Sequence, residues 1–430
     1  MIALFGKGYS AIESLGVVLL SCGITVLFTM SKVKNIIFKH IDYYLVGIIF
    51  IIQSLIGVLH FQSVINPDYF STNILGVDII DETYYFDIGY FGYLVDSIAQ
   101  HKTEEGYFTV DLASGAIHKN YFLAYLISDL FYFGDAYALN FMVINILSIF
   151  YSGIVLALIA IKIFGELDVN KRRTIFYLTI LQPIAWIPSH TMRDVFGAFL
   201  IVLSIGLIYL SVNKIQKIVF SILSLAIVFQ HRSFYVLSVA GSVVLANFSQ
   251  FKETRGASVV IICFLMLFVF LFLSTDTAQI LVSVFSASRE NSLLSGFSVF
   301  SLMEHFVKMI VGPFPWTQFY DGSVKGHAAF YSSSLMLQAS WHITILYFLF
   351  RNIKKILFSK QIRNYCYVVI LFAVPAIFSL GGHNFYLFPS YLLALPLLQM
   401  IPISRFATAF FGSICLYIFA SALYFFLKLT

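Results

Sequence analysis

Long apolar runs, separated by short polar segments, repeat from one end of the chain to the other. Many of these runs approach about 20 residues, the length that an α-helix needs to cross the hydrocarbon core of a bilayer. A transmembrane β-barrel would instead show short segments in which apolar and polar residues alternate. The pattern therefore predicts an all-α polytopic integral membrane protein.

Basic residues are concentrated in five of the polar segments, and they orient the predicted spans. These segments are 31–40, 162–174, 212–217, 251–256 and 351–364. Because cytoplasmic loops collect Lys and Arg, we place all five in the cytoplasm. This orientation predicts a single transmembrane domain, 1–430, of about twelve helices. The predicted spans are 11–30, 42–64, 140–164, 174–190, 195–212, 217–231, 234–250, 257–275, 336–352, 365–380, 385–402 and 406–428.

Two long segments, 65–139 and 276–335, then lie on the external side of the membrane. Residues 120–134 form a short apolar run with Asp129 inside it. If this run crossed the membrane, the basic segment 162–174 would lie outside. We therefore expect it to form an amphipathic helix at the external interface, a depth that suits Tyr and Phe.

Composition excludes several other classes of protein. The chain is 60% hydrophobic and 11% charged, with a mean hydropathy of +0.90, which leaves too little charge to cover a soluble protein of this length. The net charge of +5 does not imply a nucleic-acid partner, because the basic residues are explained by topology. No zinc-binding spacing and no phosphate-binding loop is present, so we predict no metal site, no nucleotide and no redox cofactor.

The external segment 76–102, GVDIIDETYYFDIGYFGYLVDSIAQHK, gathers carboxylates among tyrosines. Asp81 and Glu82 are adjacent, and Tyr84 and Tyr85 follow them. A solvated loop or a loosely bound calcium ion would explain such a cluster without chemistry. A carboxylate beside a sugar hydroxyl can also act as a general base, and aromatic rings stack on sugar faces. We therefore predict Asp81 and Glu82 as catalytic residues.

Ionisable residues also stand close to membrane depth on the external side. Arg193 and Arg232 occupy very short links between spans, where a charge is costly unless it faces a cavity or a ligand. Snorkelling to the headgroups, or pairing of Arg193 with Asp194, would be a purely structural explanation. Arginine at such a site also suits phosphate or pyrophosphate through bidentate contacts. The predicted substrate-binding residues are Arg193, Asp194, His231, Arg232, Lys308, Trp316, Tyr84, Tyr85 and His383.

Two groups of membrane enzymes share these features. The segment DETYYFDIGYFGYLVDSIAQ (81–100) resembles the acidic motif in the first external loop of GT-C type glycosyltransferases. The segments 188–210 and 224–241 are similar to paired helices of Wzy-type O-antigen and exopolysaccharide repeat-unit polymerases, which carry essential external arginines. GPFPWTQF (312–319) is similar to segments of both groups. Unlike the glycosyltransferases, this chain has two predicted helices before its acidic loop.

The resemblance implies a GT-C-like fold with two long external segments. It matches Asp81 and Glu82 to the acidic loop of the glycosyltransferases, and Arg193 and Arg232 to the external arginines of the polymerases. It also implies a bacterial inner-membrane protein whose active site faces the periplasm. Its expected partners are a polyprenyl-linked glycan, the lipid bilayer and a chain-length regulator.

Three functions remain open at this point. The first is an O-antigen polymerase that joins undecaprenyl-pyrophosphate-linked oligosaccharides, an inverting transfer. The second is a GT-C glycosyltransferase that moves one sugar from a polyprenyl phosphate. The third is a polysaccharide or lipid transporter or flippase, although the two halves of the chain show no repeat of the kind common in transporters.

Overall fold

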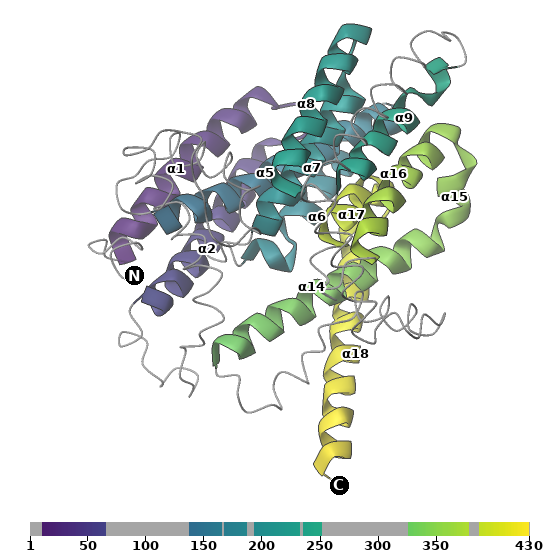
Figure 1. Cartoon of the computed structure of the whole chain (residues 1–430). Coiled ribbons are helices and arrows are strands. Elements are labelled where there is room, and N and C mark those ends of the chain that lie inside the picture. Colours follow the sequence, from purple (N-terminus) through teal and green to yellow (C-terminus); the bar gives the residue numbers. More distant parts are fainter. Residues whose placement is uncertain are drawn as a thin grey trace, which may run out of the picture.

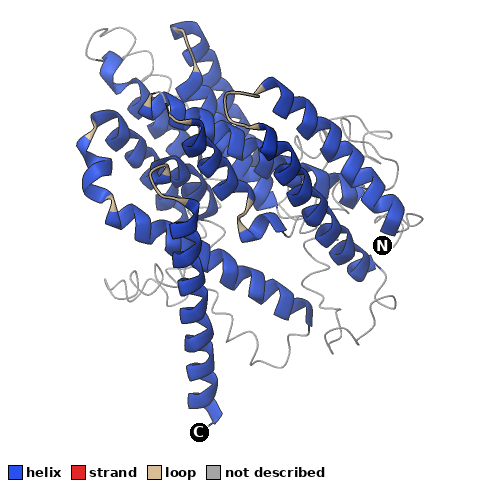
Figure 2. Ribbon diagram, turned by 180° about the vertical axis from the view of Figure 1, so that it is seen from behind, coloured by secondary structure: helices blue, strands red, loops and turns tan. Residues whose placement is uncertain are grey.

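The computed structural model describes residues 11–65, 137–165, 167–186, 193–232, 235–251, 326–377 and 387–429. This part of the chain is almost entirely helical, as Figure 1 and Figure 2 show. Its helices are α1 (Ala11–Lys32), α2 (His40–Ile65), α5 (Tyr137–Phe164), α6 (Val169–Ile180), η4 (Pro183–Trp186), α7 (Arg193–Leu210), α8 (Lys214–Arg232), α9 (Val236–Phe251), α14 (Gly326–Arg351), α15 (Ile353–Phe358), α16 (Lys360–Ile377), α17 (Phe388–Ala394), η7 (Leu395–Leu398) and α18 (Ile403–Leu429).

Three stretches of the described helices are long and apolar enough to cross a membrane. They are His40–Val58 of α2, Val143–Phe164 of α5 and Ile403–Leu423 of α18. Protein buries 78% of the α5 stretch but only 17% of the α18 stretch. The helix α5 is therefore central, whereas the C-terminal half of α18 extends away from the other helices (Figure 1). The prediction of a helical protein is confirmed for the described residues, and three of its helices are long and apolar enough to cross a membrane.

The centre of the bundle is built on aromatic rings. Phe176 of α6 meets Phe38, in the loop before α2, edge-on at 4.8 Å between ring centroids. It meets Phe150 of α5 at 5.6 Å, and Phe150 in turn meets Phe50 of α2 at 5.6 Å. Edge-to-face pairs of this kind are favoured over flat stacking. These rings therefore hold α2, α5 and α6 together.

The loop before α2 meets the first turn of α6 at one end of the bundle, which we call the basic end. Lys39 Nζ donates a hydrogen bond to Asn170 Oδ1 at 2.8 Å. Arg172 Nη1 donates to the carbonyl of Ile36 at 2.7 Å. The helix α5 ends beside them at Gly165, whose φ of +78° is the left-handed conformation in which helices commonly stop.

Other basic segments reach the same end. Lys217, in the first turn of α8, lies close enough to Lys162 of α5 for their charges to interact. Tyr209, at the end of α7, meets Tyr365, near the start of α16, edge-on at 5.4 Å. The structure thus gathers at one end several of the segments that the sequence places in the cytoplasm.

The predicted span 174–190 is wrong as a single helix. The helix α6 ends at Ile180, and η4 begins at Pro183. Proline has no N–H to donate to the carbonyl four residues back, here that of Thr179, and its ring clashes with it. Just before the break the carbonyl of Ile180 accepts a hydrogen bond from Gln53 Nε2 of α2 at 3.0 Å. A side chain of another helix therefore replaces a missing backbone donor.

The predicted span 385–402 is also interrupted. The helix α17 ends at Ala394, and Pro396 lies in the 3-10 turn η7 that follows. Here the hydroxyl of Tyr365 donates to the carbonyl of Leu393 at 2.8 Å. Every residue of α17 is buried, so this short helix lies inside the bundle.

Two further boundaries differ from the prediction. The helix α14 begins at Gly326, inside the predicted external segment 276–335, because its serine-rich first turns are helical without being apolar. The basic segment 351–364 contains α15 and the start of α16. The predicted span 257–275 and the interface helix at 120–134 lie outside the described residues. The other predicted spans agree with α1, α2, α5, α7, α8, α9 and α18 to within a few residues.

We expect Gly153→Ala to destabilise the protein. A Cβ at Gly153 would lie 2.8 Å from Cδ2 of Phe176, a ring that is completely buried among other rings. Overpacking of this kind costs about 1–3 kcal/mol, so the thermal unfolding midpoint in detergent should fall. Gly47→Ala is the matched control, because it has the same gain in helix propensity and its Cβ meets nothing within 4 Å. Equal midpoints for the two variants would contradict the packing argument.

Candidate functional site

Four of the predicted site residues stand at two helix ends. Arg193 and Asp194 begin α7, and His231 and Arg232 end α8. The two helices pack together and are joined by a short turn, 211–213, so they form an antiparallel hairpin. They have 18 and 19 residues, so each is about 27 Å long. The hairpin therefore brings both arginine-bearing ends to one level, opposite the basic end.

The remaining predicted site residues lie outside the described part of the chain. They are Asp81, Glu82, Tyr84, Tyr85, Lys308, Trp316 and His383. The structure does describe α2 and α5, the helices before and after the acidic segment. The helix α2 starts at the basic end and runs away from it to Ile65, and α5 starts at Tyr137 and returns to it.

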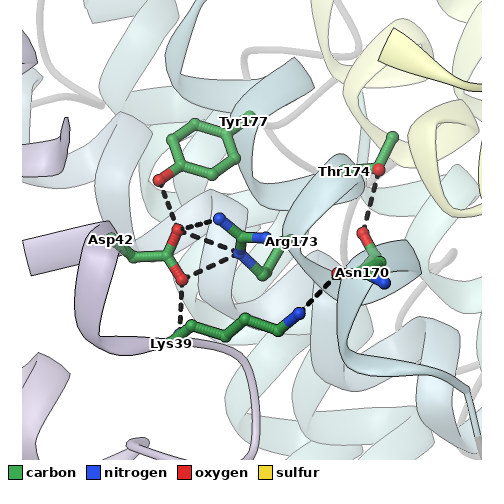
Figure 3. Close-up of polar contacts among 6 residues, drawn as sticks. All are labelled: Lys39, Asp42, Asn170, Arg173, Thr174 and Tyr177. Carbon is green, nitrogen blue, oxygen red and sulfur yellow. Dashed lines mark hydrogen bonds and ion pairs between the residues drawn. The ribbon is translucent and has the colours of Figure 1, made fainter.

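An ion pair that the sequence did not reveal fastens α2 to α6 at the basic end (Figure 3). Asp42 is completely buried, and the side chain of Arg173 is 19% exposed. Arg173 Nε donates to both carboxylate oxygens, at 2.9 and 2.8 Å, and Nη2 donates to Oδ1 at 2.6 Å. The hydroxyl of Tyr177 donates to the same Oδ1 at 2.6 Å. This carboxylate is satisfied by charge and by hydrogen bonds, as a buried ion requires.

Asp42 also caps the N-terminus of its own helix. It is the third residue of α2, and its carboxylate accepts a hydrogen bond from the backbone N–H of Lys39, just before the helix. This is one half of a capping box, which satisfies an N–H that the helix leaves free. A signal for this role was present in the sequence. Asp42 is a carboxylate at the start of an apolar span, where an acid needs a partner.

A second polar cluster lies in the apolar interior, at the break after α6. Gln182, Gln338 and His342 are each 1% exposed or less. Gln338 Nε2 lies 3.3 Å from Gln182 Oε1 and 2.8 Å from His342 Nε2. The ring of His342 stacks on the ring of Tyr391 of α17, with centroids 3.8 Å apart. The cluster therefore joins α14 to both interrupted segments, α6–η4 and α17–η7.

The unsatisfied groups of this cluster are hydrogen-bond donors. The amide nitrogen of Gln338 can only donate, so Nε2 of a neutral His342 accepts, and the ring proton is on Nδ1. Within the described residues, neither that Nδ1 nor Nε2 of Gln182 has a hydrogen-bond partner. Buried polar groups are normally paired. The cluster is thus suited to an oxygen acceptor.

No protein-family model, no curated protein and no solved structure matches this chain.

We expect the Asp42–Arg173 pair to behave as one energetic unit. Asp42→Ala leaves a largely buried guanidinium without its counter-ion, which costs about 3–5 kcal/mol. Arg173→Ala leaves the carboxylate unpaired at a similar cost. The double variant should lose less than the sum of the single losses, because the second substitution removes the charge that the first left unpaired.

Denaturant unfolding in detergent measures these losses. Asp42→Ala combined with Lys214→Ala is the control, because Lys214 is an exposed residue at the start of α8. That pair should be additive. Full additivity of the Asp42 and Arg173 losses would show that the two side chains are not coupled.

Proposed function

We propose that this chain is a membrane-embedded glycosyl-transfer enzyme of bacterial surface polysaccharide assembly. Its most specific form is an O-antigen repeat-unit polymerase of the inner membrane, with about twelve spans, a GT-C-like fold and a site that faces the periplasm. The observation that supports it is the α7–α8 hairpin. The helix ends that carry Arg193 and Arg232 lie at one level, opposite the basic end that the orientation rule assigns to the cytoplasm.

In this proposal the arginines bind the pyrophosphate of the lipid-linked donor, together with Lys308. A hydroxyl oxygen of the acceptor sugar attacks the anomeric carbon of the donor glycan, and the bond from that carbon to the pyrophosphate oxygen breaks. Asp81 or Glu82 takes the hydroxyl proton, and the arginines stabilise the leaving pyrophosphate. No nucleotide is consumed, because the bond to the carrier lipid is already activated.

A single-sugar transferase of the GT-C type would use the same groups. The donor would then be a polyprenyl phosphate, and the product would gain one sugar rather than a whole repeat unit. The acidic segment after α2 fits both versions, so the product distinguishes them.

The interior of the bundle favours a second candidate, a transporter of a polar solute. Transporter sites often lie near the bilayer midplane, where interrupted helices meet. The cluster of Gln182, Gln338 and His342 lies at such an interruption, and Gln182 is about 20 Å along α6 from the basic end. The unpaired donors in this cluster would suit the oxygen atoms of a sugar.

The test of the first proposal is the surface polysaccharide of a strain that lacks the gene, complemented with variants and separated on a gel. We expect the deletion strain to stop at one repeat unit and the wild-type gene to restore the ladder. Asp81→Ala and Arg232→Ala should fail to restore it while the protein reaches the membrane in normal amount. A full ladder of altered mass would instead indicate a single-sugar transferase.

Arg232→Lys tests the chemistry of that position. A lysine keeps the charge but cannot form the two parallel hydrogen bonds that a guanidinium makes to phosphate. We expect the ladder to be lost or strongly shortened. Lys354→Arg, a change in the exposed α15, should leave the ladder unchanged. Full activity of Arg232→Lys would show that this position needs only a positive charge and not the paired hydrogen bonds of a guanidinium.

His342→Phe separates the enzyme from the transporter. Phenylalanine keeps a ring to stack on Tyr391 and removes both ring nitrogens. We expect the ladder to remain, because the proposed chemistry occurs at the external end of the bundle. Loss of all surface polysaccharide, at a normal amount of protein in the membrane, would favour the transporter.

A further inference from the structure

A pocket of about 440 Å³ lies between α2, α6 and the start of α18, close to the Asp42–Arg173 pair. Its volume is in the usual range for small-ligand sites, about 300–1,000 Å³. It is lined by Leu45, Ile49, Asn170, Arg173, Thr174, Tyr177, Leu181 and Ile403. We call it the α6 groove, because five of these residues lie on one face of α6 and the turn after it.

The α6 groove is polar at one end and apolar at the other. Asn170, Arg173 and Thr174 lie in the first two turns of α6, at the basic end. Leu181 lies about 12 Å further along the helix axis, beside the break. The opposite wall is Leu45 and Ile49, one turn apart on α2. The groove therefore runs from a polar mouth at the basic end toward the middle of the apolar bundle.

The polar mouth of the groove carries N–H donors beyond those used in the contacts described above. Arg173 uses Nε and Nη2 for Asp42, so Nη1 takes no part in that ion pair. Asn170 accepts from Lys39 through its oxygen, which leaves its amide nitrogen as a donor. Lys39 has three N–H donors on its ammonium group. Asn170 and Arg173 lie on α6, and Lys39 reaches Asn170 from the loop before α2.

The charge at this mouth is positive even after the internal ion pair is counted. Asp42 neutralises Arg173. Lys39, Lys171 and Arg172 are three further cations on the same two segments, against Asp168, the N-cap of α6, as one further anion, so the balance is positive. An occupant with a negative group would be favoured here, and Arg and Lys both bind phosphate oxygens strongly.

The walls of the groove continue into surface that faces the bilayer. Leu45 is 41% exposed and Ile403 is 39% exposed. Ile48, on the next face of α2, is 54% exposed, and the α18 stretch that follows Ile403 is mostly unburied. In a membrane these side chains contact lipid, so an acyl chain can enter the groove sideways from the bilayer.

We propose that the α6 groove binds an acidic phospholipid from the leaflet at the basic end. The phosphate accepts hydrogen bonds from Arg173, Asn170 and Lys39, and one acyl chain lies along Ile49 toward Leu181. The lipid bridges α2, α6 and α18, and so covers a seam at which α18 has little protein contact of its own. This site is independent of the proposed chemistry at the external end.

The test is a lipid titration of the detergent-solubilised full chain by native mass spectrometry. The probes are dioleoyl phosphatidylglycerol, dioleoyl phosphatidylcholine and inorganic phosphate. We expect the acidic lipid to bind in one-to-one ratio and about tenfold more tightly than the zwitterionic lipid, the difference that one charge-assisted contact provides. Phosphate alone should not bind measurably.

Two variants locate the site, each with a matched control. Lys39→Gln should weaken binding of the acidic lipid about tenfold, whereas Lys214→Gln, at an exposed site on α8, should leave it unchanged. Ile49→Trp fills the groove without a change of charge and should abolish binding. Ile48→Trp, on the adjacent exposed face, should not.

Each remaining outcome would overturn the proposal. Equal loss in Ile48→Trp and Ile49→Trp would place the lipid elsewhere on α2. Equal affinity for the two lipids would show that the polar mouth does not recognise the acidic headgroup. Competition by inorganic phosphate would show that the site binds free anions rather than a lipid. Full retention of binding in Lys39→Gln and Ile49→Trp, with their unfolding midpoints unchanged, would mean that the lipid adsorbs on the surface only.

Discussion

The interior of this bundle is apolar, so every backbone group inside it needs a partner supplied by the protein. A continuous helix meets this need by itself, but Pro183 and Pro396 interrupt two helices where they are buried. In both places the protein supplies a side chain from a neighbouring helix. Gln53 donates to the carbonyl of Ile180, and Tyr365 donates to the carbonyl of Leu393. These two contacts make the breaks tolerable, and the breaks create the room for a polar cluster.

The Asp42–Arg173 pair places these elements relative to one another. Asp42 caps its own helix and holds Arg173, one turn before Tyr177 on α6. With the aromatic contacts of Phe176, it fixes α6 against α2, and this register brings Gln53 to the end of α6. One face of α6 lines the groove between α2 and α18. The groove lies beside the ion pair, because Arg173 both pairs with Asp42 and lines the groove.

Hydropathy predicted most of the described helices, because it decides which segments can enter a bilayer. The ends predicted for the span 42–64 fall within a few residues of α2, and those for 406–428 fall within a few residues of α18. The break at Pro183 was missed because the apolar run continues through this residue. Hydropathy summed over a window of about 19 residues does not register the loss of a single N–H donor. The partner of Asp42 is 131 residues away in the sequence, and no local pattern reports such a contact. Of the predicted external site, the structure describes the backbone of four residues only.

The described features lie at three depths along the bundle. The ion pair and the groove are at the basic end, the Gln182 cluster is in the middle, and the ends that carry Arg193 and Arg232 are on the far side. An enzyme that acts on a lipid-linked donor needs a charged site at one face only, and in our proposal this site is the far end of the α7–α8 hairpin. A transporter needs a polar path through all three depths. Phe372 of α16 and Phe388 of α17 are among the largest side chains that are completely buried in the described part of the chain. The central cluster joins two interrupted helices to α14, whereas the proposed chemistry uses only the far end of the bundle.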